Sequence, residues 1–196
     1  MVVTGNNTFR YYNLSNGLQQ VKQEITAKEN QGSTHYTCHV WAAGKLYVCT
    51  NQGEILQLDS KSCKGRIDCS PNDGLAIEAI VTSGKKLITG GENNSLYFFN
   101  LESEGSKSLC ERQNMEAITI SSQLPELGNA RIRSLAVSRN NSWLVISLDN
   151  NQLIKAELTA QNVEHTKFEY LHYNAHSAAV IHNTYSNFRS TDSTFA

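Results

Sequence analysis

One short unit recurs along this chain and constrains what the chain can fold into: an apolar strand, a polar turn, and a second strand of alternating pattern. Two copies run through the turns Asn51-Gln52-Gly53 and Glu92-Asn93-Asn94. A third runs through Asp149-Asn150-Asn151, and a fourth through Asn6-Asn7 near the start of the chain. Asn, Asp and Gly tolerate the positive φ that a tight turn between twisted strands requires. Each copy therefore predicts a β-hairpin.

Further strands flank the hairpins, so the whole repeating unit has four strands. Apolar strands are expected before the three complete hairpins, at residues 36–41, 75–82 and 131–138, and more polar strands after them, as at 64–69 and 168–173. The spacing from turn to turn is about 45, 42 and 57 residues. The extra length before the last unit predicts a loop insertion between Leu109 and Ala130, where Pro125 and Gly128 interrupt the pattern. Four strands repeating every ~40–45 residues are typical of β-propeller blades.

The number of units predicts an all-β fragment of a propeller, with three whole four-stranded blades and partial blades at both ends. The first unit begins at its second strand, and residues 175–180 are expected to open another blade. We therefore expect a partial propeller over residues 1–177 and an atypical, poorly ordered polar tail over residues 178–196. Since propellers have about four to eight blades, a slice of a larger ring is favoured over a small four-bladed ring. An unrelated antiparallel sandwich with the same spacing is the other alternative.

The charge balance and the apolar pattern argue against several classes of protein. The formal net charge is −1, without the basic excess that nucleic-acid binding requires, so no nucleic-acid partner is expected. No apolar run reaches the ~20 residues of a membrane-spanning helix, so no membrane partner is expected. Residues 1–5 lack the features of a secretory signal peptide, which predicts a location inside the cell. Five cysteines without a C-x-x-C pair predict reduced thiols.

A group of His35, Cys38, His39 and Cys49 is the one stretch that resembles a set of metal ligands. Zinc sites use paired ligands at short, fixed spacings from two separate elements. Cys38 and His39 are instead adjacent on a predicted strand, so their side chains face opposite sides of the sheet. We therefore expect a buried thiol and a packed histidine here, and no metal site.

No enzyme motif accompanies the repeat. The chain has neither a G-x-S-x-G elbow nor a P-loop, and Thr89-Gly90-Gly91 is too short to cradle a phosphate. Glu102 and Glu104 are expected to be solvated in a loop, and the aromatic residues 97–99 are expected to pack in the core rather than stack on bases. The sequence thus predicts no catalytic, cofactor-binding or metal-binding residues, no cofactor, and a binding or scaffolding module. An enzyme on a propeller fold would need acidic or histidine side chains converging on a central channel.

The ends of two predicted third strands resemble the WD-repeat family. Leu58-Asp59 and Phe99-Asn100 stand where that family carries a Trp-Asp dipeptide. Two longer stretches are similar to the cilia- and flagella-associated members of the family. One is Cys38 to Trp41 followed by residues 45–48 and 53–55, and the other is Leu148 to Leu153 followed by residues 167–171 and 176–177. The resemblance covers residues 1 to about 177, and residues 178–196 depart from it.

This resemblance implies a non-enzymatic scaffold of the ciliary or flagellar axoneme, within the cytoplasm and its cytoskeleton. The implied role is to help place inner dynein arms on doublet microtubules, with inner-arm components and the doublets as partners. The family has no catalytic residues that could be carried over. The alternative is a WD-repeat adaptor in another intracellular complex, such as a ubiquitin ligase or a trafficking complex.

The blade pattern also predicts which side chains are covered, because the two inner strands of a blade are packed on both faces. In a closed propeller, truncating any one of the eight residues named below to alanine is expected to lower the free energy of unfolding by ~2–5 kcal/mol. The residues expected between sheets are Val40, Leu46, Val48, Ile80, Leu87, Leu135, Leu144 and Ile146.

Overall fold

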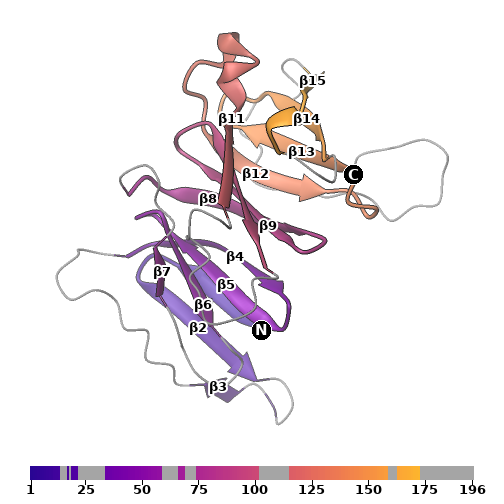
Figure 1. The fold of residues 1–196 in the computed structure, drawn as a ribbon. Coiled ribbons are helices and arrows are strands. Elements are labelled where there is room, and N and C mark those ends of the chain that lie inside the picture. Colours follow the sequence, from indigo (N-terminus) through magenta and orange to yellow (C-terminus); the bar gives the residue numbers. More distant parts are fainter. Residues whose placement is uncertain are drawn as a thin grey trace.

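Four antiparallel sheets make up the computed structural model, and they lie one after another along the molecule (Figure 1). Three of the sheets have four strands and the N-terminal one has three. Within each sheet the strands pair in the order in which they follow one another along the chain. The predicted all-β fold with three whole blades, preceded by a partial blade, is therefore confirmed. The structure describes residues 1–13, 17, 19–21, 34–58, 66–68, 74–101, 115–158 and 163–172.

Fifteen strands are found in these ranges. The first sheet contains β1 (Val2–Gly5), β2 (Thr8–Asn13) and β3 (Gln19–Val21). The second contains β4 (Tyr36–Ala42), β5 (Lys45–Thr50), β6 (Glu54–Leu58) and β7 (Arg66–Asp68). The third contains β8 (Ile77–Ser83), β9 (Lys86–Gly91), β10 (Ser95–Asn100) and β11 (Met115–Thr119). The fourth contains β12 (Ile132–Val137), β13 (Trp143–Leu148), β14 (Leu153–Glu157) and β15 (Phe168–His172).

The three predicted hairpins are confirmed, at the β5–β6, β9–β10 and β13–β14 connections. The third residue of each predicted turn has positive φ: 73° at Gly53, 54° at Asn94 and 66° at Asn151. Asn7 has φ of 47° in the corresponding β1–β2 turn. These values place the left-handed residue where glycine and asparagine carry the smallest steric cost, which explains why the turns have this composition.

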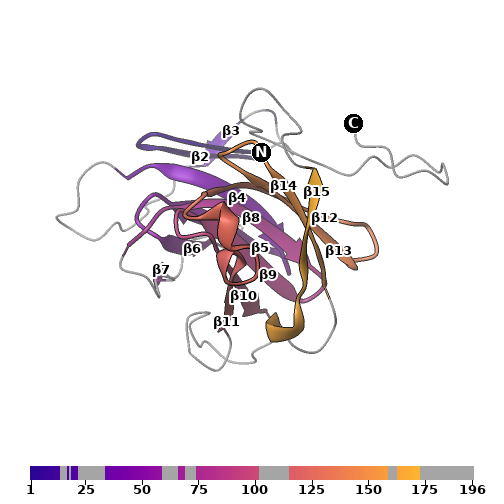
Figure 2. The same ribbon diagram turned by 90° about the horizontal axis from the view of Figure 1, so that it is seen from above.

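Three apolar layers lie between the four sheets. Because successive side chains of a strand point to opposite faces, one strand contributes to the layers on both sides of its sheet. Leu46 and Val48 of β5 face the first sheet, whereas Tyr47 and Cys49 face the third. The largest layer lies between the third and fourth sheets and includes Phe98. Strand β8 contacts both β4 and β12, so the first strands of the whole blades lie beside one another. The later strands β7 and β11 lie at the periphery when the molecule is seen from above (Figure 2).

Seven of the eight residues expected between sheets are buried, and Val40 is the exception. Val40 is only partly buried against the layer between the second and third sheets. The edge position of β4 does not account for this, because Ile80 and Leu135 are buried on β8 and β12, which are also edge strands of their sheets.

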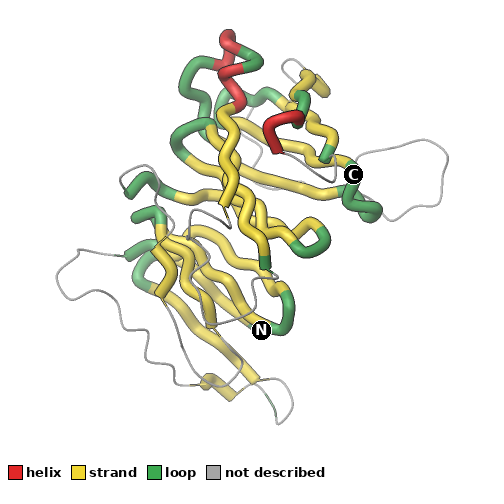
Figure 3. Tube along the Cα trace, viewed as in Figure 1, coloured by secondary structure: helices red, strands yellow, loops and turns green. Residues whose placement is uncertain are grey.

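The loop insertion expected between Leu109 and Ala130 is only partly correct. Met115–Thr119 forms β11, the outer strand of the third blade, which pairs with β10. After it come two short 3-10 helices, η1 (Ile120–Ser122) and η2 (Pro125–Leu127), and a third, η3 (Val163–His165), precedes β15. Figure 3 shows these short helices in red, beside the yellow strands that make up most of the described chain. In the described residues, no helix is long and apolar enough to cross a membrane.

Several sequence predictions lie outside the described residues. They concern Glu102 and Glu104, the expected further blade at residues 175–180, and the expected polar tail at residues 178–196. Cys63, Cys69 and Cys110 lie outside as well. The domain boundary near residue 177 therefore stays a prediction.

Candidate functional site

The first strand of every whole blade carries a β-bulge at the same place. The register shifts between Tyr36 and Cys38 in β4, between Ile77 and Ala79 in β8, and between Ile132 and Ser134 in β12. A bulge leaves one residue out of the ladder and re-aims its side chain. The residues left out are polar in all three blades, namely Thr37, Glu78 and Arg133.

These three bulged residues line one cavity of about 420 Å³, which we call the bulge cavity. Because β4, β8 and β12 lie side by side, their bulges meet there although they are far apart in the sequence. The cavity opens at the N-terminal ends of these strands, next to the β5–β6 and β9–β10 turns. Its other lining residues are His35, Asn51, Ala76 and Glu92.

Polar contacts around the bulge cavity run from one blade to the next. Arg133 pairs with Glu78, and Arg131 pairs with Glu92 at 3.1 Å between Nη1 and Oε1. The Thr37 hydroxyl donates to the carbonyl of Ile77. The arginine side chains are 40% and 47% exposed, so each pair contributes about 0–1 kcal/mol and orients the side chains more than it stabilises the fold.

The first residue of the turn between the second and third strands of each whole blade is hydrogen-bonded to the residue that precedes the first strand of that blade. The side-chain oxygens of Asn51 and Asp149 accept the backbone N–H of His35 and Arg131, both at 2.9 Å. In the middle blade a Glu92 carboxylate oxygen lies 3.3 Å from the backbone nitrogen of Ala76. The backbone N–H of each turn residue donates back to the carbonyl of the same partner. This reciprocal pair joins the start of each whole blade to its hairpin turn, and in the second and third sheets the paired residues line the bulge cavity.

The structure places the four residues that resembled metal ligands in three different surroundings, with His35 at the bulge cavity. Cys38 and Cys49 are register partners and face the third sheet. His39 faces the first sheet, where its Nδ1 lies 3.3 Å from the Thr4 hydroxyl. The prediction that Cys38 and His39 lie on opposite faces is therefore confirmed. Among the described residues, no group of three or more His, Cys, Asp or Glu side chains is arranged to hold a metal ion.

Burial shifts the pKa values of His39 and Cys49 in this set of four residues. It lowers the pKa of His39, which favours the neutral ring. Burial also raises the pKa of the Cys49 thiol, and the neighbouring Cys38 raises it further. A thiol of this kind is protonated and poorly nucleophilic, as expected for a packing residue.

Sequence reasoning did not single out Thr37, Glu78 or Arg133. The one signal was a polar residue at the second position of an otherwise apolar strand. The aromatic run behaves as predicted, since Tyr97 and Phe99 pack in one apolar layer and Phe98 in the next.

Comparisons with known proteins agree with this arrangement, although no family model matches the chain. Over 68 residues the chain is 34% identical to the ciliary WD repeat-containing protein ctxp80 of Euplotoides octocarinatus, which is 35% of this chain and 10% of that protein. A chain of the Mitotic Checkpoint Complex aligns with a TM-score of 0.65 and 13% identity, over 94% of this chain and 54% of that one. The β-propeller domain of Myceliophteria thermophila Cps50 (Swd1) aligns with a TM-score of 0.63 and 10% identity, over 86% and 54%. The chain has a β-propeller fold.

This chain spans about half the length of the two solved chains, and its match to the ciliary protein spans a tenth of that protein. The solved chains show the propeller fold, and the ciliary match adds local similarity to a WD repeat-containing protein.

Proposed function

We propose that this chain is part of a non-enzymatic WD-repeat scaffold of the ciliary or flagellar axoneme. The observation that carries the proposal is the 34% identity over 68 residues to a ciliary WD-repeat protein. The two sequence stretches that resemble cilia- and flagella-associated proteins also support it, and both resemble cilia- and flagella-associated protein fifty-seven. On this proposal the scaffold helps to position inner dynein arms on doublet microtubules.

The geometry suits a scaffold better than a catalyst. The charged side chains around the bulge cavity are paired with one another across neighbouring blades, and the cysteine and histidine of β4 serve packing. Such an arrangement presents fixed polar groups to a protein surface.

Localisation of the tagged full-length gene product in a ciliated cell tests the proposal. We expect signal along the axoneme, and a diffuse or nuclear signal without axonemal signal would overturn it. The dynein role has its own test: cryo-electron tomography of axonemes from cells lacking the gene should show missing inner-arm density. Intact inner arms would remove that role and leave an axonemal scaffold.

A second candidate is an adaptor in another intracellular assembly, such as a ubiquitin ligase or a trafficking complex. It is favoured by the structural neighbour from the Mitotic Checkpoint Complex, since the same fold is used there in a different protein assembly. Proximity labelling with the tagged protein separates the candidates, because an adaptor would label ligase or trafficking subunits and leave axonemal proteins unlabelled.

A further inference from the structure

A second cavity, which we call the turn cleft, opens between the third and fourth sheets at the opposite end of the first strands. Strand β8 begins beside Ala76 in the bulge cavity and ends at Ser83 in the turn cleft. The turn cleft has a volume of about 470 Å³, which lies within the ~300–1,000 Å³ range of ligand pockets. Two hairpin turns form its rim, residues 83–86 between β8 and β9 and residues 140–142 before β13.

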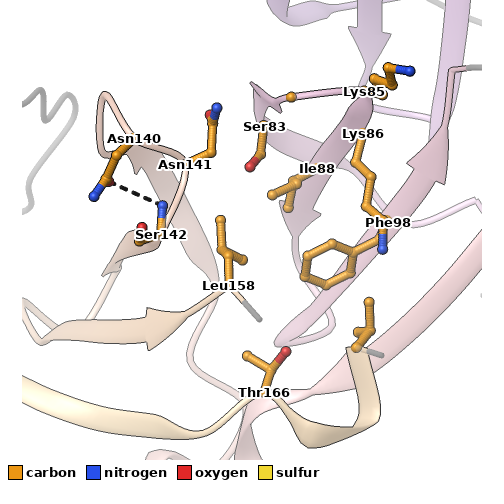
Figure 4. Close-up of a pocket in the computed structure, with 12 residues that line it drawn as sticks. Ser83, Lys85, Lys86, Ile88, Phe98, Asn140, Asn141, Ser142, Leu158 and Thr166 are labelled. Atoms are coloured by element: carbon orange, nitrogen blue, oxygen red, sulfur yellow. Dashed lines mark hydrogen bonds between the residues drawn. The ribbon is translucent and has the colours of Figure 1, made fainter. Parts of the chain in front are cut away.

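The floor of the turn cleft is apolar. Ile88 and Phe98 of the third sheet and Leu158 at the end of β14 point toward one another in Figure 4. Val163 and Thr166 close the side nearest β15. This floor offers an aliphatic side chain a site that excludes water, which is the main source of affinity for an inserted apolar group.

Two side chains at this interface, Ile88 and Ala156, are smaller than their equivalents one interface earlier. Ala156 pairs with Leu144 in the fourth sheet as Phe99 pairs with Leu87 in the third. Ile88 likewise is the third residue of its strand, as Tyr47 is in the second sheet. Where Tyr47 and Phe99 fill the earlier interface, Ile88 and Ala156 leave more room in this one.

One lysine at the rim of the turn cleft, Lys86, carries a positive charge that is not balanced by an ion pair within the described chain. Lys85 and Lys86 lie on the β8–β9 turn, and Lys86 forms no ion pair with any described residue. The described lining contains no carboxylate, and Glu157 and Glu164 are neighbours of lining residues in sequence without lining the cleft themselves. The remaining rim groups are neutral donors and acceptors on Ser83, Asn140, Asn141 and Ser142.

We propose that the turn cleft is the docking site for a short acidic segment of a partner protein. The segment places one aliphatic side chain between Phe98 and Leu158 and a carboxylate against the Lys86 ammonium. Charge complementarity favours an acidic peptide. One lysine without an ion pair among the described residues, above an apolar floor, favours a peptide over nucleic acid, which needs a basic surface. This inference goes beyond the axonemal proposal and does not depend on it.

Panning a phage-displayed library of random twelve-residue peptides against the full 196-residue chain tests the inference. The matched counter-target is Ser142→Trp, which fills the cleft from its half-buried rim. We expect enriched peptides that carry Asp or Glu beside Leu, Ile or Val and that do not bind the Ser142→Trp variant. Failure to enrich any peptide, enrichment of basic peptides, or equal binding to the blocked variant would overturn the proposal.

Fluorescence anisotropy with one enriched synthetic peptide then tests the role of Lys86. We expect Lys86→Glu to weaken binding by about tenfold or more and Lys86→Gln by less, because charge reversal adds repulsion to the loss of attraction. Lys45→Glu is the matched control, since Lys45 is the first residue of β5 as Lys86 is of β9, and it should change affinity less than twofold. Unchanged affinity in a folded Lys86→Glu protein, or equal losses in both variants, would contradict the assigned site. Thermal melts confirm that each variant is folded.

Discussion

Asn94 combines three properties that no other residue type supplies together at its position. It is 1% exposed, its φ is 54°, and its carboxamide joins two segments of the chain. Nδ2 donates to the carbonyl of Ala130 at 2.6 Å, and Oδ1 accepts the backbone N–H of Ser121 at 2.8 Å. Ala130 lies just before the fourth blade, so a turn of the third blade positions the start of the next one.

Replacing Asn94 by alanine should therefore destabilise the fold by about 2–4 kcal/mol. The change leaves a buried N–H and a buried carbonyl without these partners and places a Cβ-bearing residue without the compensating amide at positive φ. Asn94→Gly is the control, because it removes the amide but relieves the backbone, and it should lose less stability than Asn94→Ala. Urea denaturation followed by circular dichroism measures both. Equal stability of Asn94→Ala and the natural protein would show that the bridge contributes nothing.

At Thr89, removing a polar group is expected to raise the stability of the protein rather than lower it. Thr89 is fully buried on β9, and its hydroxyl has no hydrogen-bond partner in the described structure. Valine has nearly the same shape without the polar group, so Thr89→Val should be neutral or stabilise the protein by up to about 1–2 kcal/mol. Thr89→Ser, which keeps the hydroxyl and loses the methyl group, should be less stable than the natural protein. A Thr89→Val protein that melts several degrees lower would mean that the hydroxyl is satisfied in solution.

At the scale of elements, the end of β9 is built from two glycines because other segments pack directly on it, the next blade on Gly90 and the start of its own blade on Gly91. A Cβ at Gly90 would lie 2.8 Å from both Cδ1 and Cγ2 of Ile132 in β12, and one at Gly91 would lie 1.9 Å from the carbonyl oxygen of Ala76. The glycine pair that is too short for a phosphate loop thus has a packing role. It allows β12 to approach β9 more closely than any side chain would permit.

A double-mutant cycle between Gly90 and Ile132 tests this contact. Gly90→Ala alone should destabilise through overpacking by about 1–3 kcal/mol, and Ile132→Ala alone through cavity formation by about 2–5 kcal/mol. The double mutant should be more stable than the sum of the single changes predicts, by about 1 kcal/mol or more, since the alanine methyl occupies part of the vacated space. Additive effects would mean that the two positions do not share a contact. Gly91→Ala should be far more damaging than Gly90→Ala, because backbone cannot yield as a side chain can.

The elements also divide into those that the sequence predicts and those that it does not. The hairpins at residues 51–53, 92–94 and 149–151 were predictable because positive φ is a local requirement met by Asn and Gly. Strand β11 was missed because Met115–Thr119 is half exposed and alternates weakly. The bulges at Thr37, Glu78 and Arg133 come from register shifts, which depend on how neighbouring strands pair. The turn cleft joins residues near 85 and 141, and only the packing of two blades brings them together.

At the scale of the whole molecule, the sheets form a series in which each interface has its own strength. In the described residues, the layer between the third and fourth sheets contains sixteen buried residues, against eight between the second and third and five between the first and second. Since hydrophobic stabilisation scales with the apolar area removed from water, the layers should differ in the free energy needed to open them. The weakest interface is the one that holds β1 and β2 through Val2 and Phe9.

Hydrogen exchange should therefore reveal a gradient along the molecule. Backbone amides of β1 and β2 should exchange through local openings of low free energy, and those of β9 and β13 through openings close to global unfolding. Native-state exchange with mass spectrometry, at increasing low concentrations of denaturant, resolves the two groups. Val48→Ala weakens the first interface and should speed exchange mainly in the first two sheets. Ile146→Ala weakens the largest interface and should speed exchange in β8–β10 and β12–β14. Uniform protection in all four sheets, or faster exchange in β13 than in β1, would contradict a series of unequal interfaces and indicate one cooperative unit.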